Sequence, residues 1–288
     1  MTHCATDHWP LGVFTSIDAG LGVSFDVLAQ LQLTTIQLHA PDATNRTPEA
    51  ALETAERLQR LGIEVTCVFA GFAGESYADI PTVQRTVGLV PQETRDTRVT
   101  ELKQIVDYAN HLGVKAVGLH LGFVPHDPQQ EDYRRLVQTT RDLCDYCSAQ
   151  GQTIHLETGQ EPADVLEGFL ETVARENLFV NFDPANMILY GCGEPLPALE
   201  RIGRYVRSVH CKDAKWSDKP GDTWGTEVAL GEGDVDFTQF LRILEAIRYK
   251  GPLTIEREIP EDPQRQLEEI GKGVDLLRRT MQSLNFSS

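Results

Sequence analysis

Eight short β-type segments recur along the chain, and segments with helical spacing of their apolar residues separate them. The β-type segments lie near residues 11, 34, 64, 116, 153, 178, 206 and 253. Among the intervening ranges, 48–61, 99–112 and 262–281 carry the amphipathic pattern of helices that cover a sheet. Strict alternation of strand and helix favours a parallel sheet, and about 250 residues is typical of an eight-stranded parallel barrel. The sequence therefore predicts an α/β fold, a (β/α)8 TIM barrel with a single domain over residues 1–288. An open doubly wound sheet is the alternative.

Glycines mark several of the predicted junctions between a helix and the next strand. Gly62, Gly113, Gly151 and Gly251 each follow a helical range and precede a strand by a few residues. Glycine is the usual residue where a helix ends in the left-handed conformation. We therefore expect all four to cap helices.

Composition excludes several classes of protein. The net charge is −17, from 43 acidic and 26 basic residues, which disfavours a nucleic-acid partner. The opening "MTHCATDHWP" has no secretory pattern and no run approaches eighteen apolar residues, so we expect a cytoplasmic protein without a membrane partner. The six cysteines are scattered, as in a reducing compartment. Cys144 and Cys147 form a C-x-x-C pair within a helical range and are best interpreted as two small residues on one helix face.

Residue parity assigns a direction to each side chain of the later strands. In a barrel, alternate side chains face the helices and the interior. Because the apolar residues of these strands face the helices, four polar residues near the carboxyl ends point inward. These are Glu157, Asp183, His210 and Glu256.

Such a cluster needs a cation. An unpaired buried carboxylate costs several kcal/mol, roughly, and three together would repel one another. Carboxylate oxygen and imidazole nitrogen are suitable ligands for Mn, Mg, Zn or Co. The pattern therefore predicts one divalent metal ion held by the four residues. The alternative is that Lys212, Lys215 and Arg257 neutralise the carboxylates.

Five short motifs resemble a known family in their order and strand positions. They are "HLETGQ", "NFDPAN", "VHCKDAK", "LGEGDVDF" and "LTIERE". They resemble the sugar phosphate isomerase/epimerase family, whose members have a xylose-isomerase-like TIM barrel. The resemblance implies a metal held by Glu157, Asp183, His210 and Glu256, with Glu157 and Glu256 also transferring protons as the catalytic pair. One residue departs from the pattern of the related ketose 3-epimerases, because Asn186 stands where they carry a substrate-binding histidine.

The implied chemistry is proton transfer next to a carbonyl. A metal chelated by the carbonyl and the adjacent hydroxyl of a keto sugar would stabilise an enediolate as a Lewis acid. One glutamate would remove the proton, and the other would return it to the opposite face or to the neighbouring carbon. The expected substrate is therefore a small carbohydrate: a keto sugar, a polyol ketone or a sugar phosphate.

Other polar residues on the same rim are candidate substrate ligands. His120 and His39 point inward by the parity rule, and Asn186 can hydrogen-bond a sugar oxygen. Lys212 could bind a substrate oxyanion or pair with Asp213 or a glutamate. His155 lies deeper than Glu157 and is predicted to support a ligand from behind or to be a core residue.

Two long connections are expected near the site. Residues 71–98 are too long for a simple connection and should cover the pocket. Their arginines, Arg85, Arg95 and Arg98, either bind a phosphate or lie solvated in the loop. Residues 214–233 contain two tryptophans that supply an apolar wall or a subunit contact. In "LGEGDVDF" an aspartate N-cap is favoured over a phosphate loop.

The leading prediction is thus a metal-dependent isomerase or epimerase. An inosose dehydratase-like lyase begins with the same proton abstraction and is the main alternative. A non-catalytic sugar-binding subunit is a second alternative, and a repair nuclease is disfavoured by the acidic charge. The sequence leaves the substrate, the metal identity and a homo-oligomeric state open.

Overall fold

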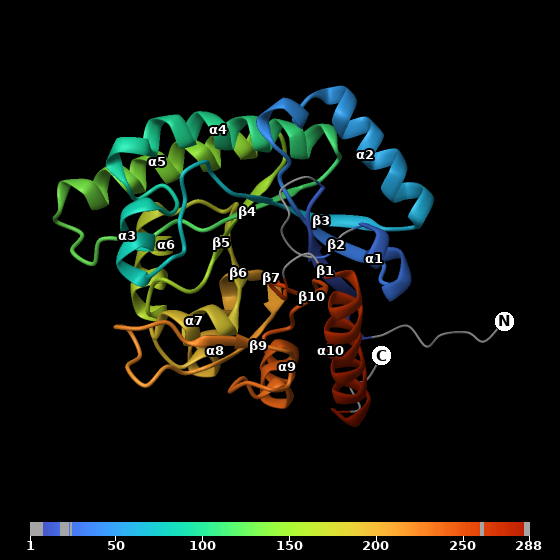
Figure 1. Cartoon of the computed structure of the whole chain (residues 1–288). Coiled ribbons are helices and arrows are strands. Elements are labelled where there is room, and N and C mark those ends of the chain that lie inside the picture. Colours follow the sequence, from blue (N-terminus) through green and yellow to red (C-terminus); the bar gives the residue numbers. More distant parts are fainter. Residues whose placement is uncertain (1–7, 18–22, 24, 260–261, 285–288) are drawn as a thin grey trace.

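Eight parallel strands close into a barrel in the computed structural model, which describes residues 8–17, 23, 25–259 and 262–284 (Figure 1). In barrel order the strands are β1 (Leu11–Thr15), β2 (Thr35–His39), β3 (Glu64–Ala70), β4 (Ala116–Leu119), β5 (Thr153–Glu157), β6 (Leu178–Phe182), β7 (Val206–Cys211) and β10 (Leu253–Ile255). The barrel closes where β1 pairs with β10 in parallel, with Leu11 opposite Leu253 and Val13 opposite Ile255. The predicted barrel is confirmed, and the open sheet is wrong.

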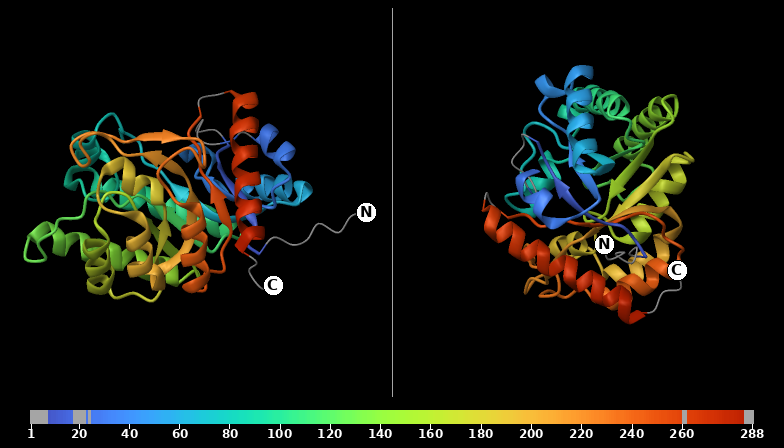
Figure 2. Two further views of the ribbon diagram at one scale, coloured as in Figure 1. Left: turned by 90° about the horizontal axis from the view of Figure 1, so that it is seen from below. Right: turned by 90° about the vertical axis from the view of Figure 1, so that its right-hand side faces the viewer.

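Helices surround the barrel and pack side by side on its outside (Figure 1). They are α1 (Phe25–Leu31), α2 (Pro48–Leu61), α3 (Ile80–Thr86), α4 (Gln92–His111), α5 (Glu131–Ser148), α6 (Ala163–Val173), α7 (Pro184–Tyr190), α8 (Pro195–Ile202), α9 (Phe237–Ala246) and α10 (Pro263–Leu284), with the short 3-10 turns η1 (Ala43–Asn45) and η2 (Gly203–Tyr205). The long α10 runs along the barrel and contacts both α1 and α9, so the last helix packs beside the first (Figure 2).

Local signals explain most helix ends. The Thr47 hydroxyl accepts from the Ala50 amide at the start of α2, and Gly62 ends that helix with φ 69°. Gly113 and Gly151 also have positive φ, as predicted. Gly251 does not have a positive φ, so the expected left-handed cap there is wrong. A Cβ at Gly251 would lie 2.4 Å from the Tyr249 hydroxyl oxygen, and close packing is therefore the reason for glycine.

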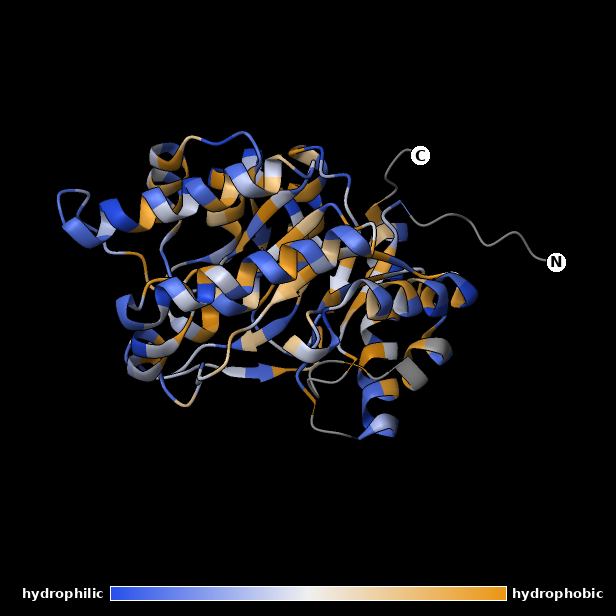
Figure 3. Cartoon of the chain, turned by 90° about the horizontal axis from the view of Figure 1, so that it is seen from above, coloured by the Kyte–Doolittle hydropathy of each residue, from blue (hydrophilic) through white to orange (hydrophobic). Residues whose placement is uncertain are grey.

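Apolar side chains gather between the strands and the inner faces of the helices, while the outer helix faces are hydrophilic (Figure 3). Inside the barrel, Phe14, Cys67 and Phe69 form a separate apolar cluster. Gly118 on β4 leaves room for it, because a Cβ there would lie 2.4 Å from the Phe69 ring. The interior near β1 and β3 is thus filled by hydrocarbon, and the polar groups are concentrated near β5, β6, β7 and β10.

The two long connections are partly structured. Residues 71–98 contain α3 and the first two turns of α4, which starts earlier than the predicted 99–112 because its inner face carries arginines instead of apolar residues. Residues 214–233 include most of an antiparallel hairpin of β8 (Asp213–Lys215) and β9 (Thr226–Val228). Within the described residues, the helices are all too short or too polar to cross a membrane.

Candidate metal centre and active site

Four polar side chains meet at the carboxyl end of the barrel. Glu157 ends β5, Asp183 follows β6, His210 lies in β7 and Glu256 follows β10. One ligand atom from each lies within 4.8 Å of all the others. The Nδ1 atom of His210 is 2.6 Å from Glu157 Oε1, 3.1 Å from Glu256 Oε2 and 3.7 Å from Asp183 Oδ2. Parallel strands that end at the same edge therefore bring together residues that are almost a hundred positions apart in the sequence.

A chain of amide hydrogen bonds fixes the orientation of the His210 ring. The Asn181 amide donates to Glu157 Oε1 at 3.4 Å, so the Asn181 oxygen faces Gln37 and accepts from its Nε2 at 3.1 Å. The Gln37 oxygen then faces His210 Nε2 at 2.8 Å and accepts its proton. Because Nε2 carries this proton, the lone pair of a neutral His210 lies on Nδ1, among three carboxylates.

Asp183 has one oxygen in use and one that is free. Its Oδ1 accepts a hydrogen bond from the backbone N–H of Asn186 at 3.0 Å and so caps α7. Its Oδ2 is buried without a hydrogen-bond partner among the described residues. Complete burial raises the pKa of Asp183 to about 6, against the opposing effect of His210 and Lys212. A buried carboxylate oxygen with no partner, aimed into a cluster of acids, is the environment that a bound cation would satisfy.

The remaining ionisable groups are strongly coupled to one another. Burial opposes charge on Glu157, yet His120 and His210 lower its pKa to about 2. His120 Nε2 lies 2.7 Å from Glu157 Oε2, and despite burial this contact raises the pKa of His120 to about 9. The carboxylates of Glu256, Glu157 and Asp183 raise the pKa of His210 well above its usual value, although burial acts in the opposite direction. Without a metal ion, protonated imidazoles therefore supply the positive charge that the acids require.

These observations fit a divalent cation. Three carboxylates and one imidazole nitrogen converge, one oxygen has no other partner, and the imidazole proton is held on the far nitrogen. This donor set suits Mn, Mg, Zn or Co. In the alternative, Lys212, Lys215 and Arg257 neutralise the carboxylates; among the described ion pairs, these three residues reach one of the four ligands, Glu256, which lies 3.3 Å from Lys212 Nζ.

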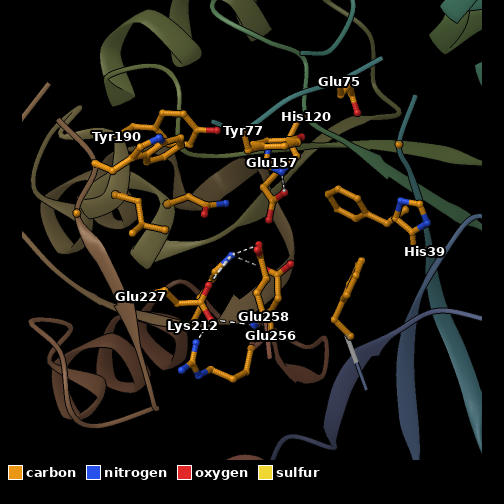
Figure 4. Close-up of a pocket in the computed structure, with 18 of the residues that line it drawn as sticks. His39, Glu75, Tyr77, His120, Glu157, Tyr190, Lys212, Glu227, Glu256 and Glu258 are labelled. Atoms are coloured by element: carbon orange, nitrogen blue, oxygen red, sulfur yellow. Dashed lines mark hydrogen bonds and ion pairs between the residues drawn. The ribbon is translucent and has the colours of Figure 1, made fainter. Parts of the chain in front are cut away.

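A cavity of about 390 Å³ opens directly above the cluster (Figure 4). Glu157 and Glu256 line this cavity, whereas Asp183 and His210 are fully buried behind them. Phe14 and Phe69 form an apolar floor. Two of the four predicted ligands thus belong to the ligand cluster and also border the space that a substrate would occupy.

The predicted substrate ligands also lie around this cavity. His39, His120, Asn186 and Lys212 all line it. Their roles toward a substrate stay predictions. His155 is different, since it lies deeper, hydrogen-bonds the Ser208 hydroxyl at 2.8 Å and has a pKa lowered to about 3 by burial. It is a core residue, as expected.

Several residues of the site are absent from the sequence prediction. Gln37 has the same parity as His39, so the strand pattern contained a signal for it. The others line the cavity from loops, from the end of α7 or from the β8–β9 hairpin, where parity gives no direction. They are Glu75, Tyr77, Tyr190, Glu227 and Glu258. Glu75 and Tyr77 come from the connection after β3, which covers the pocket as predicted. Trp224 supplies the expected apolar wall.

Both readings of Arg95 and Arg98 are wrong. The two guanidinium groups are buried in α4 and donate to backbone carbonyls of residues 73 and 88–90, and Arg95 also pairs with Asp132 at 2.7 Å. They neither lie in solvent nor reach the cavity, because they hold the connection after β3 in place. Arg85 is exposed, which agrees with the alternative that it lies in solvent.

The glycine-rich turn after β9 binds an internal carboxylate. The amides of Gly231 and Gly233 both donate to Asp213 Oδ2 at 2.9 Å. Asp236 caps α9 by accepting from the Gln239 amide at 3.0 Å. The predicted N-cap is therefore confirmed, and Asp213 pairs with this turn instead of with Lys212.

Cys144 and Cys147 are both free and fully buried in the core beneath α5. Their surroundings are apolar, because they belong to the main hydrophobic core cluster. Burial raises the pKa of each thiol to about 12. The interpretation as packing residues is consistent with this environment.

The fold and the cavity define a parallel (β/α)8 barrel with an acidic, metal-type ligand cluster at its carboxyl end. Residues 25–280 match the family described as Xylose isomerase-like TIM barrel, and the chain belongs to this family.

Solved structures and curated sequences agree with this assignment. A xylose isomerase domain protein from Planctomyces limnophilus is 53% identical, with a TM-score of 0.93 over 96% of this chain and 98% of that one. An L-ribulose 3-epimerase from a Methylomonas species is 30% identical over 47% of this chain and 46% of its own length. An inosose dehydratase from Glaesserella parasuis is 26% identical over 46% of this chain and 49% of its own length. The matched region thus spans about half the length of these curated relatives.

Proposed function

We propose that the protein is a divalent-metal-dependent isomerase or epimerase that acts on a small keto sugar, polyol ketone or sugar phosphate. One observation supports this proposal above all: Glu157 and Glu256 belong to the ligand cluster and also line the cavity. A bound ion would supply Lewis-acid polarisation of a substrate carbonyl. The relatives named as L-ribulose 3-epimerase and inosose dehydratase are in keeping with this chemistry.

The residues of the chain would divide the remaining work. Glu157 and Glu256 reach the cavity from opposite sides (Figure 4), so one carboxylate can take a proton from carbon, and the other, once it is protonated, can donate to the opposite face or to the neighbouring carbon. Lys212 keeps Glu256 ionised, since its ammonium lies 3.3 Å from that carboxylate. His120 does the same for Glu157. Phe14 and Phe69 exclude water from the floor of the site.

A lyase of the inosose dehydratase type is the second candidate. Asn186 favours it, because an amide can hold a substrate oxygen but cannot relay a proton, and several matched relatives are named inosose dehydratases. Both reactions begin with the same proton abstraction. They differ in whether an isomeric sugar or a dehydrated product accumulates.

NMR in deuterated water separates the candidates. Solvent deuterium in an isomeric carbohydrate supports the isomerase or epimerase, and loss of water supports the lyase. Glu157→Gln and Glu256→Gln should each abolish exchange of the substrate C–H proton in a folded barrel. Exchange at the wild-type rate in either variant would refute the assignment of the two glutamates.

A further inference from the structure

We propose that the cavity accepts only uncharged carbohydrate and rejects phosphorylated substrates, and that Glu258 is a specificity-determining residue for this choice. The inference rests on the proposed function and narrows its substrate class. It follows from where the charges around the cavity lie and from which cations remain available to bind an anion.

Acidic side chains outnumber basic ones around the cavity. Five glutamates line it, against one lysine, one arginine and two histidines, of which His120 already lies 2.7 Å from Glu157 Oε2. An excess of carboxylates remains even after a divalent ion is counted, because Asp183 adds another acid behind the wall. A phosphate dianion would enter a negative potential, which weakens binding and slows approach.

Lys212 has no spare positive charge to offer a phosphate. Its ammonium is buried and lies 3.1 Å from Glu258 Oε1, 3.3 Å from Glu256 Oε2 and 3.7 Å from Glu227 Oε2. Three carboxylates around one ammonium overcompensate its charge. An incoming anion would have to displace one of these carboxylates. The contacts of Lys212 therefore serve to neutralise the neighbouring glutamates.

Arg257 is committed in the same way. Its Nη1 donates to Glu227 Oε1 at 2.6 Å, and its Nε donates to Glu269 Oε2 at 2.8 Å. The guanidinium therefore bridges the β8–β9 hairpin to α10. Because Nε and Nη1 are each already bonded to a glutamate, neither pair of adjacent guanidinium nitrogens is fully free for the bidentate contact typical of phosphate recognition.

The other groups of this region that could bind a phosphate are already hydrogen-bonded within the chain. Arg95 and Arg98 bind backbone carbonyls beneath the connection after β3. The amides of the glycine-rich turn bind Asp213. The described part of the chain therefore offers a phosphate at this cavity neither a free cation nor a free amide nest.

Neutral polar side chains, in contrast, also line the cavity. The buried Trp224 indole N–H has no hydrogen-bond partner among the described residues, and Trp224 lines the cavity. The Asn186 amide and the Tyr190 hydroxyl line the same wall. Such groups can pair with sugar hydroxyls, and aromatic rings pack against sugar C–H faces.

Glu258 controls the mouth of this site. Its side chain is 64% exposed while its carboxylate reaches Lys212, so it lies between solvent and the buried ammonium (Figure 4). Removing its charge leaves Lys212 with two neighbouring carboxylates in place of three. The exposure of Glu258 also means that its replacement should not disturb folding.

The test is binding calorimetry with matched ligands in the presence of added Mn²⁺. A panel of free ketoses is compared with the phosphates of the same sugars, for example D-fructose and D-fructose 6-phosphate. We expect the free sugar of a pair to bind at least about tenfold more tightly, and Glu258→Gln to reduce this ratio severalfold. Glu176→Gln, an exposed acid after α6, removes the same charge far from the cavity and should leave the ratio unchanged.

Three binding results would overturn the inference. They are tighter binding of the phosphates, an unchanged ratio in Glu258→Gln, and a panel in which no free ketose binds at all. The proposed function is tested separately by proton exchange. Exchange with sugar phosphates alone would refute the inference and leave the isomerase or epimerase standing. Selective binding of free sugars without exchange would support the inference and refute that function.

Discussion

Replacing Asp183 by asparagine should make the metal-free protein more stable and at the same time remove its response to metal. Asp183→Asn keeps the shape of the side chain and the Oδ1 atom that accepts from the Asn186 amide, so the cap of α7 survives. What the change removes is the charge on Oδ2, which is buried without a partner among the described residues. The two expected effects have opposite signs, and a purely structural role cannot produce both.

The magnitude follows from the pKa of this group. Burial raises the folded-state pKa of Asp183 from 3.8 to about 6. At about 1.4 kcal/mol per pH unit, ionisation costs the folded metal-free protein roughly 3 kcal/mol at neutral pH. Relaxation of the site would reduce this to about 1–2 kcal/mol, which corresponds to a rise in Tm of about 2–6 °C. Because the folded pKa is the higher one, the advantage of the variant is complete above about pH 6 and disappears below about pH 4.

The assay is thermal unfolding of wild type and Asp183→Asn, first with EDTA and then with excess Mn²⁺. Asp96→Asn on the exposed face of α4 is the charge-matched control and should behave as wild type. We expect the variant to unfold at a higher temperature in EDTA, and only wild type and the control to gain stability from Mn²⁺. A variant that is less stable in EDTA and still stabilised by Mn²⁺ would refute the reasoning.

Three further perturbations test the surroundings of the site. Gln37→Leu removes the acceptor of the His210 Nε2 proton and should weaken Mn²⁺ binding about 10- to 100-fold in titration calorimetry, whereas unchanged affinity would mean that this contact does not orient the ring. Burial raises the pKa of Glu161 to about 8, so the unfolding free energy of wild type should fall by about 1 kcal/mol or more between roughly pH 4.5 and pH 8. Urea unfolding of Glu161→Gln should not show this fall, and an equal dependence of its unfolding free energy on pH would contradict the assignment. Gly118→Ala places a methyl group 2.4 Å from the Phe69 ring and should cost about 1–3 kcal/mol of unfolding free energy, so a variant as stable as wild type would show that the ring has room to move.

The strand pattern carried most of what could be predicted about the fold and the ligand cluster. Alternation of polar and apolar residues assigned Glu157, His210 and their neighbours to the interior, and a barrel places the carboxyl ends of its strands at one edge. The same rule would have found Gln37. Parity works here because both faces of each strand are covered, so a polar residue among apolar ones has only one place to point.

The pattern failed where a side chain depends on tertiary contacts. Arg95 and Arg98 form the buried face of a helix whose first turns carry no apolar periodicity, because their guanidinium groups bond to backbone carbonyls instead of packing against hydrocarbon. Glu258 and Trp224 lie outside the barrel strands, where no repeat fixes direction. Their positions depend on the hairpin and on Lys212, which only the folded chain brings together.

The number of Mn²⁺ ions bound by each chain is the most direct test of the account. Metal-free protein would be dialysed against Mn²⁺ and its metal content measured by atomic emission, together with that of Glu157→Gln. The account predicts one ion per wild-type chain and a clear loss of binding in the variant. Wild-type protein that binds no ion, or a variant that binds as much as wild type, would contradict it.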